Sequence, residues 1–532
     1  MWCWIRLFNF TFMKRFFNTT GLCNPEDHYM VEPFRGMFNE IYHLIEAKQY
    51  FLIHAPRQTG KTTFLHQLAH RLNREGKYTA AVCSLESAGY PSISVSDANE
   101  VFIQSLYQTA QVFLNGAKLP PNPTHYKAGP QLFRQYLSDW SKALDQPLVL
   151  LVDEVDALYD DVLIAVLRQF RDGFQTRPQG FPQSIALVGL RDIREYRTRA
   201  RADNPSIGAG SPFNVKAESF FLPVFTREEV RGLLSQHTED TGQEFSDAVF
   251  EKIYEYAAGQ PWLTNALANE IVVKMLRNDH SKVITPDMVI EAKERLIEQR
   301  QTHLDSLADK VREERVRKIV MSIIEGSPLE FDTLDDSIRY CRDLGLITQK
   351  SPIRFANPIY RETITRMLNS PLQESFPEEI SETAWYLDEE GRLMMDKLLE
   401  AFIDFYRWNS ESWLERFTYK EAGHQLLLMA FLQRVVNGGG RIEREMAVGN
   451  GRTDLAVFWR DQVIPIELKI HYNARTLPEG LRQLHRYMDK LGQEHGYLMI
   501  FETQPSTELP WDERIRREEK EYEGKSISVL WL

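Results

Sequence analysis

The chain has 532 residues, 43% of them hydrophobic and 26% charged, and its formal net charge is −12. This length exceeds what one hydrophobic core usually organises, so two to four domains are expected. The composition is that of an ordinary soluble globular protein. The negative charge has the wrong sign for general affinity to nucleic acid, so any such contact must come from local basic patches.

The first stretch of the chain, MWCWIRLFNFTFMKRFF, is apolar, but Arg6 interrupts it and Lys14-Arg15 closes it. It is shorter than the roughly 20 residues that span a bilayer, and no small-residue cleavage site follows. Whether Met1 or Met13 is the natural start stays open. Four cysteines without paired spacing argue against a disulfide framework or a zinc site and suit a reducing compartment. We therefore predict a cytoplasmic protein without membrane contact.

A phosphate-binding loop is indicated by HAPRQTGKTT, residues 54–63, which lies between a buried strand pattern and an amphipathic helix pattern. Gly60 lets the backbone approach phosphates, Lys61 reaches the β and γ oxygens, and Thr62 is placed for Mg²⁺. Ala55 stands where a first glycine is expected, and alanine is tolerated there if the backbone stays in an allowed region. The alternative is a glycine helix cap with a solvated lysine. The predicted ATP-binding residues of this loop are Pro56, Gln58, Thr59, Gly60, Lys61, Thr62 and Thr63.

An apolar run that ends in acids, PLVLLVDEVDAL, is typical of a parallel strand buried on both faces. Asp153 would join Thr62 in the Mg²⁺ shell, and Glu154 would orient or deprotonate the attacking water. The alternative is a core strand followed by an acidic helix start. Further strands are predicted at Tyr78–Ser87, Ser184–Asp192 and Ser219–Phe225. Strands alternating with helices predict a doubly wound parallel sheet, with phosphates at the carboxyl ends of its strands.

Together with FFNTTG and HYMVEP upstream, these motifs resemble the AAA+-like, STAND-related P-loop ATPases of prokaryotes. The resemblance covers most of the first 370 residues. It implies a polar sensor after the strand that follows the acidic motif, here Arg191 or Arg194, and a helical lid with a Gly-x-Pro motif, here Gly259-Gln260-Pro261. The five arginines between Arg191 and Arg201 could contact ATP, a neighbouring subunit or nucleic acid, or form a solvated loop. A homo-oligomer therefore stays open.

The pattern turns helical after Thr226, which forms a capping box with Glu229. Beyond this lid, GLITQKSPIRFANPIY suggests two short strands around a turn, the wing of a winged-helix module. Such modules bind DNA, but in the resembled ATPases they commonly pack on the nucleotide domain as a relay. The helix before the wing, DDSIRYCRDLG, is acidic enough to repel phosphate, which favours the relay. A proline-containing acidic stretch without a helical stripe then predicts a linker.

Two strand patterns near the C-terminus, GRTDLAVFW and VIPIELKI, are separated by the short turn RDQ. Because side chains alternate along a strand, Glu467 and Lys469 share one face. The core-facing residues around them are Ile466, Leu468 and Ile470. Hairpin pairing would bring Asp454 beside Glu467. Two carboxylates and a lysine form a hard-oxygen Mg²⁺ site whose ammonium can stabilise a hydroxide or a phosphorane.

This set closely resembles the PD-(D/E)XK nuclease superfamily, over roughly residues 395 to 532. The resemblance implies that Glu421 is the acid of a first helix, and that Asp454 and Glu467-Leu468-Lys469 supply the strand motif. Thr453 stands where many members have proline. Gln483 and Tyr487, four residues apart, would lie on one face of the next helix. The implied metal ligands are Glu421, Asp454 and Glu467, and the implied catalytic residues are Asp454, Glu467, Lys469 and Gln483.

Each element of this set has an ordinary alternative, because a Glu-x-Lys pair on a surface strand is common. Four arginines flank the predicted site and could neutralise a DNA backbone locally. They are Arg434, Arg441, Arg444 and Arg452. Arg441 and Arg444 could equally be solvated partners of nearby glutamates.

The predicted fold class is multidomain α/β, with a P-loop ATPase sheet, a lid, a winged-helix-like module and a restriction-endonuclease-like domain. The predicted boundaries are 1–30 for an N-terminal segment, 31–225 for the ATPase domain, 226–305 for the lid, 306–369 for the winged-helix-like module, 370–394 for the linker and 395–532 for the nuclease-like domain. The leading hypothesis is an ATP-regulated, Mg²⁺-dependent nuclease acting on nucleic acid, with DNA favoured. Family analogy alone suggests defence against foreign DNA. The rivals are a STAND-like signalling switch that binds nucleic acid without cutting it and a DNA motor, which lacks a visible translocation motif.

Overall fold

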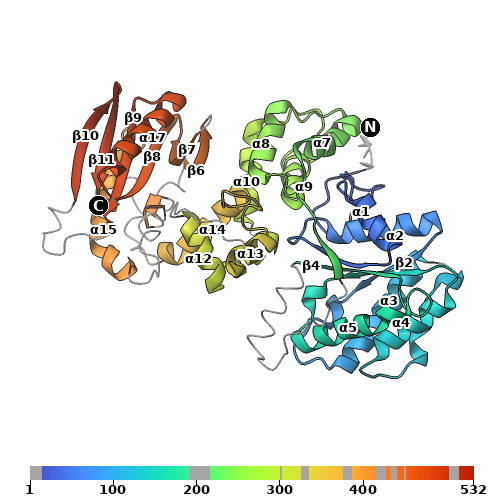
Figure 1. Cartoon of the computed structure of the whole chain (residues 1–532). Helices are drawn as coiled ribbons and strands as arrows, with labels where there is room; N and C mark the ends of the chain where they lie inside the picture. Colours follow the sequence, from blue (N-terminus) through green and yellow to red (C-terminus); the bar gives the residue numbers. More distant parts are fainter. Residues whose placement is uncertain are drawn as a thin grey trace, which may run out of the picture. The chain divides into compact units, whose positions relative to one another are not determined.

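The computed structural model describes residues 15–114, 116–190, 216–299, 302–324, 335–374, 386–414, 427–429, 431–432, 440–448, 451–471, 473–502 and 515–532 (Figure 1). The chain divides into two compact units. Unit 1 is Met1–Ser306 with Phe331–Ile359, and unit 2 is Leu307–Glu330 with Tyr360–Leu532. Each unit is described by itself.

Unit 1 is built on a five-stranded sheet in which all neighbouring strands are parallel, in the order β2-β3-β4-β1-β5. The strands are β1 (Tyr50–His54), β2 (Thr79–Ser84), β3 (Leu148–Asp153), β4 (Ser184–Gly189) and β5 (Lys216–Phe221). β5 begins and ends earlier than the predicted strand at Ser219–Phe225. It stops before Pro223, which has no N–H to donate to a ladder.

Helices cover both faces of this sheet (Figure 1). One face packs on α1 (Phe38–Glu46) and α2 (Lys61–Glu75). The other packs on α3 (Val95–Phe113), α4 (Leu132–Ala143) and α5 (Asp160–Gly173). The central strands are buried on both faces, which explains why β3 is a continuous apolar run. The predicted doubly wound parallel sheet is confirmed.

A group of helices follows β5 in the chain. It comprises α7 (Arg227–Thr241), α8 (Asp247–Ala257), α9 (Pro261–Asn269), the π-helix η6 (Glu270–Met275) and α10 (Pro286–Glu298), followed by α11 (Thr302–Val311). The capping box of Thr226 and Glu229 starts α7 as predicted. Gly259 has a left-handed φ of 74°, and a side chain there would overlap the carbonyl oxygen of Phe225. The Gly-x-Pro turn thus lies directly against the connection from the sheet to the lid.

The region predicted as a winged helix contains α12 (Glu314–Ile324), α13 (Asp336–Asp343) and α14 (Pro358–Glu374). The predicted wing of two strands is a single antiparallel bridge, Ile347 with Phe355. The turn between them is closed by the hydroxyl of Thr348, which donates to the carbonyl of Pro352. DNA-binding winged-helix architecture is therefore not established by these elements.

The predicted linker, 370–394, is described at its two ends. Residues 370–374 continue α14 as helix, although Pro371 lies within them. Residues 386–394 pack on the C-terminal sheet: the indole of Trp459 donates to the carbonyl of Gly391 at 3.0 Å, and Leu393 is buried. These contacts attach residues 386–394 to the sheet of unit 2. The boundaries of the linker stay a prediction.

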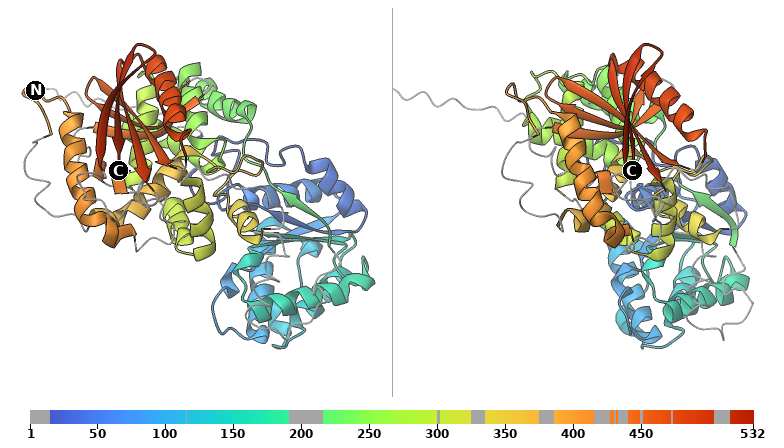
Figure 2. Two further views of the ribbon diagram at one scale, coloured as in Figure 1. Left: turned by 60° about the vertical axis from the view of Figure 1, so that its left-hand side comes forward. Right: turned by 90° about the vertical axis from the view of Figure 1, so that its left-hand side faces the viewer.

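Unit 2 contains a six-stranded mixed sheet in the order β10-β11-β9-β8-β7-β6. The strands are β6 (Gly440–Val448), β7 (Gly451–Trp459), β8 (Gln462–His471), β9 (His495–Glu502), β10 (Arg516–Tyr522) and β11 (Lys525–Trp531). β6, β7 and β8 form an antiparallel meander, and β8 pairs with β9 in parallel. The crossover from β8 to β9 is α17 (Thr476–Leu491), which packs on one face, while α15 (Met395–Leu414) packs on the other (Figure 2).

Candidate functional site

The phosphate loop begins where β1 ends and closes at the first residue of α2. Ala55 is fully buried, and its N–H donates to the carbonyl of Gly189, so alanine extends the strand pairing by one residue. Gln58 and Gly60 have left-handed φ values of 57° and 92°. Glycine is the residue that adopts this backbone without strain, so Gly60 supplies the conformation that starts α2.

The ammonium of Lys61 lies inside the loop. Its Nζ donates to the carbonyls of Ala55 at 2.9 Å and Pro56 at 2.8 Å. Burial lowers the pKa of Lys61, and the nearby carboxylates of Asp156, Glu154 and Asp153 oppose that shift. A cation held by loop carbonyls at a helix N-terminus is suited to exchange those carbonyls for phosphate oxygens.

Thr62 and Asp153, predicted to share the Mg²⁺ shell, lie together. The Thr62 hydroxyl donates to Oδ2 of Asp153 at 2.8 Å, and Oδ1 of Asp153 accepts the N–H of Glu154 at 2.9 Å. A hydroxyl and a carboxylate are the hard-oxygen donors that Mg²⁺ prefers. These residues therefore fit the ion, and they would hold it together with phosphate oxygens.

Glu154 follows directly and has a left-handed backbone, φ 57° and ψ 40°. This conformation is unfavourable for a residue with a side chain, and such strain often marks a functional position. Burial, followed by the charges of Asp156 and Asp153, raises the pKa of Glu154 to about 7. A carboxyl group with this pKa can exchange a proton with water near neutral pH.

Asp156 is a site residue that the sequence reading missed. It lies in the short helix η4 (Val155–Ala157), and its Oδ1 accepts the N–H of Leu190 at 2.9 Å. It joins the acidic loop to the end of β4, directly before Arg191, which lies outside the described residues. The signal was present as a third acid in the DEVD run.

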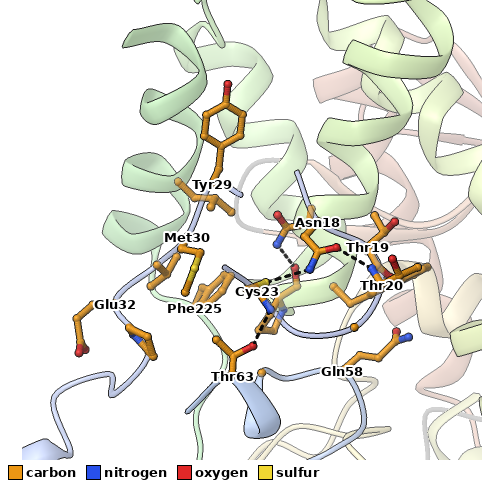
Figure 3. A pocket seen from close by; sticks show the side chains of 18 of the residues that line it. Asn18, Thr19, Thr20, Cys23, Tyr29, Met30, Glu32, Gln58, Thr63 and Phe225 are labelled. Atoms are coloured by element: carbon orange, nitrogen blue, oxygen red, sulfur yellow. Dashed lines mark hydrogen bonds between the residues drawn. The ribbon is translucent and has the colours of Figure 1, made fainter. Parts of the chain in front are cut away.

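A cavity of about 130 Å³ opens beside the loop (Figure 3). Three parts of unit 1 form its wall: the segment Asn18–Arg35, the loop with Gln58, Gly60 and Thr63, and lid residues that include Trp262. The N–H of Cys23 donates to the hydroxyl of Thr63 at 3.2 Å, and the amide of Asn18 donates to the Cys23 sulfur at 3.3 Å. The N-terminal segment thus forms part of the cavity wall beside the phosphate loop.

The remaining predicted loop residues lie as follows. Thr59 is buried and its hydroxyl donates to the carbonyl of Pro56 at 2.8 Å. The structure thus brings together Pro56, Gln58, Thr59, Gly60, Lys61, Thr62, Thr63, Asp153 and Glu154. Arg191 and Arg194 lie outside the described residues.

Residues 45–196, which contain the loop and the acidic strand, match a family model described as an AAA domain. This part of the chain is an AAA-type P-loop ATPase domain. No curated protein matches the chain in sequence.

Solved structures also resemble part of the chain. A Walker-type ATPase of Pyrococcus abyssi is 15% identical, with a TM-score of 0.47, over 65% of this chain and 99% of that chain. The Orc1 protein of Aeropyrum pernix, solved with DNA, is 14% identical, with a TM-score of 0.33, over 64% and 94%. The RuvB Holliday junction branch migration motor of Thermotoga maritima is 18% identical, with a TM-score of 0.32, over 60% and 90%.

A second candidate site lies on β8 in unit 2. Ile466, Leu468 and Ile470 belong to the apolar cluster that contains α15, so the predicted alternation is observed. On the opposite face, Nζ of Lys469 donates to Oε1 of Glu467 at 2.8 Å, and Glu467 is only 1% exposed. A methyl group added at Gly480 of α17 would lie 3.3 Å from Cγ of Lys469, so this helix passes close over the lysine stem.

The other residues predicted for this site are described only in part. Asp454 lies in β7 directly before Leu455, which pairs with Ile466, so its backbone is next to that of Glu467 along the hairpin. Its side chain lies outside the description, as do those of Arg441, Arg444 and Arg452. Gln483 is half-buried and Tyr487 is buried on α17. Glu421 and Arg434 lie in stretches that are not described.

The polar row on β8 continues past Lys469 to the end of the strand. Nδ1 of His471 lies 2.8 Å from Oε2 of Glu502, the last residue of β9, and the His471 ring stands edge-on to Trp531. Within the described ranges there is no cluster of three or more His, Cys, Asp or Glu side chains suited to a metal ion. A three-carboxylate centre in unit 2 therefore stays a prediction.

Among the helices that the structure describes in either unit, none is long and apolar enough to cross a bilayer.

Proposed function

We propose that the AAA domain binds and hydrolyses ATP and thereby regulates a Mg²⁺-dependent nuclease centre in unit 2. The observation that carries the first half is the convergence of Lys61, the Thr62–Asp153 pair and Glu154 at one sheet edge. The second half rests on Glu467 and Lys469, a buried carboxylate and an ammonium 2.8 Å apart on one strand face.

At the ATP site, the loop N–H groups and Lys61 would hold the β and γ phosphates. Thr62 and Asp153 would hold Mg²⁺, which, when bound, neutralises phosphate charge. Glu154 would accept a proton from the attacking water or orient it. The cavity between the N-terminal segment and Trp262 is the part of the site that would receive the nucleoside.

Coupling between the two activities is supported by residues 335–359, which pack on the phosphate loop in unit 1. Nδ1 of His54, at the end of β1, lies 3.7 Å from Oδ1 of Asp343 in α13. A side chain at Gly345 would overlap the ring of Pro56. In the sequence this segment is flanked on both sides by residues of unit 2. A loop that moves on nucleotide binding would therefore pull on a segment joined covalently to the nuclease-like unit.

In unit 2, Glu467 with Asp454 and Glu421 would supply the carboxylates for Mg²⁺, which, when bound, lowers the pKa of water and neutralises the scissile phosphate. Lys469 would stabilise the hydroxide or the pentavalent oxygen. Gln483 would contact the substrate from α17. Hydrolysis adds the water oxygen to phosphorus and breaks one P–O bond of the nucleic acid backbone.

The test is to incubate the purified protein with plasmid DNA, RNA and single strands, with and without ATP and Mg²⁺. The proposal expects cleavage that needs Mg²⁺, changes with ATP, and disappears in Lys469→Ala. Lys61→Ala should abolish the ATP effect and leave the chemistry of the nuclease centre intact. Equal cleavage by wild type and Lys469→Ala would assign the activity to a contaminant.

A signalling switch that binds nucleic acid without cutting it is the rival from another class. The predicted set of Asp454, Glu467 and Lys469 argues against it, because two carboxylates and an ammonium suit metal-assisted hydrolysis. Binding without cleavage of every substrate, at any nucleotide or metal condition, would support the rival. Cytoplasmic action against foreign DNA, and a homo-oligomeric state, are further parts of the proposal that rest on family analogy.

A further inference from the structure

Arg35 is an arginine of the N-terminal segment that no motif singled out. It lines the cavity beside the phosphate loop and, among the described residues that do so, it is the only cationic one. Its Nε is completely buried and has no hydrogen-bond partner within the described residues. Burial lowers the pKa of Arg35 to about 10, so the group stays charged at neutral pH. Arg35 as a whole is half-buried, so its guanidinium is partly desolvated, and this cost calls for a structural explanation.

The guanidinium connects two parts of unit 1. Nη2 donates to the carbonyl of Thr59 in the phosphate loop, and Nη1 donates to the carbonyl of Pro223, in the connection from β5 to the lid. Its Cζ also lies 4.8 Å from the centre of the Phe225 ring. One rigid, planar group therefore sets the distance between the loop and the entry to the lid.

The backbone around these contacts is adapted to them. Arg35 has a left-handed φ of 47°, and its N–H donates to the carboxylate of Glu32 at 2.7 Å. A methyl group added at Gly60 would lie 3.2 Å from Nη2 of Arg35. The absence of a side chain at Gly60 thus serves two purposes, since it permits the left-handed turn and leaves room for the guanidinium.

We propose that Arg35 is a positioning residue for nucleotide binding. A peptide unit that presents its carbonyl to phosphate repels it, whereas one that presents its N–H attracts it. By holding the Thr59 carbonyl, Arg35 keeps the loop oriented with its N–H groups toward the phosphates. By holding Pro223 with the other nitrogen, it links this orientation to the lid that carries Trp262. Lysine cannot reproduce the link, because it lacks the planar pair of donors.

The experiment compares Arg35→Gln and Arg35→Lys with wild type. The control is Arg71→Gln, which removes an arginine that also stacks on a ring, 3.5 Å from the centre of Phe38, but outside the cavity. Affinities for ATP, ADP and adenosine are measured in competition with a fluorescent ATP analogue. Thermal unfolding without nucleotide reports the fold of each variant.

We expect Arg35→Gln to weaken ATP and ADP at least about tenfold, and adenosine less than about threefold, because only the phosphates depend on the loop orientation. Arg35→Lys should fall between wild type and Arg35→Gln for ATP, and it serves as the test variant if Arg35→Gln fails to fold. Arg71→Gln should leave all three affinities unchanged.

The link to the lid has its own readout, the fluorescence of Trp262, obtained as the difference from the same protein carrying Trp262→Phe. ATP at saturating concentration should change this signal in wild type and not in Arg35→Lys. Equal losses for ATP and adenosine in the Arg35 variants would reduce Arg35 to a general structural residue and overturn the inference. Wild-type protein that binds no ATP at all would instead refute the proposed function.

Discussion

The hydroxyl of Thr62 and the carboxylate of Asp153 lie 2.8 Å apart, although 91 residues separate them in the chain. This hydrogen bond joins the start of α2 to the end of β3 across the edge of the parallel sheet. A bound Mg²⁺ would be held by the same hydroxyl and carboxylate and would replace the hydrogen bond between them. Asp153→Asn should therefore weaken Mg²⁺-dependent ATP binding while metal-free nucleotide binding changes little. Calorimetry with and without the ion measures the difference, and equal effects in both conditions would contradict it.

Ala55 in place of the first loop glycine is expected to leave nucleotide binding intact, since the residue is buried and its N–H is bonded to Gly189. Lys61→Ala should weaken ATP binding at least about tenfold, because hydrogen bonds to charged groups contribute about 1.5–3 kcal/mol. Glu154→Gln should still bind ATP but stop its turnover. Absence of ATP binding by the wild type at millimolar nucleotide would end this interpretation of the loop.

The pH dependence of ATP hydrolysis follows from Glu154. Its carboxyl must be ionised to accept a proton, and its pKa is raised to about 7, so kcat/KM for ATP should rise with pH and level off above that value. Asp156→Asn removes a neighbouring negative charge and should move the midpoint to lower pH. A rate that does not vary across the neutral range would show that proton transfer to Glu154 does not limit the reaction.

Substitutions on β7 and β8 allow chemistry and folding to be separated, because Leu468 and Lys469 are neighbours on opposite faces of β8. Asp454→Ala and Lys469→Ala should each lower nuclease activity by about a thousandfold, several kcal/mol of transition-state stabilisation. The midpoint of thermal unfolding should hardly change. Leu468→Ala, at a site only 3% exposed, should instead lower the free energy of unfolding by about 2–5 kcal/mol through the cavity it leaves. Loss of stability in Lys469→Ala would mean that this residue has a structural role.

The contact of His54 with Asp343 tests the proposed coupling. Asp343→Asn removes the charge that faces His54 at 3.7 Å and should reduce the influence of ATP on nucleic acid cleavage. ATP hydrolysis itself should fall by less than about threefold, because neither residue belongs to the proposed catalytic set. Asp336→Asn, on the same helix but paired with Arg339, is the matched control. An unchanged ATP effect in Asp343→Asn would remove this contact from the coupling.

Patterns local in sequence predicted much of this fold. The apolar run ending in Asp153 and the Gly60-Lys61-Thr62 sequence were enough to expect a parallel sheet with a phosphate site. Burial of a strand on both faces and a tight loop each depend on residues that are adjacent in the sequence. The alternation around Glu467 was equally readable. These are cases in which a residue's role depends on its immediate neighbours.

Hydrogen bonds between a side chain and a backbone group far away in the sequence could not be predicted in this way. Arg35 binds the carbonyls of Thr59 and Pro223, and every residue type offers such a carbonyl, so no side-chain pattern marks them. The bond from Leu190 to Asp156 is of the same kind. Pro371 is a case in which a local rule does not hold. Proline usually ends a helix, yet α14 continues through Pro371 to Glu374.

The N-terminal segment is fastened to the lid as well as to the phosphate loop. The amide of Gln236 in α7 bonds both the N–H and the carbonyl of Met30, Arg15 pairs with Asp240, and the indole of Trp262 donates to the carbonyl of Thr19. A shortened protein that begins at residue 31, as a designer guided by motifs would choose, would therefore keep every phosphate-binding residue and lose one wall of the nucleotide cavity. Such a truncation would retain the sequence motifs and is expected to bind nucleotide more weakly than the longer protein.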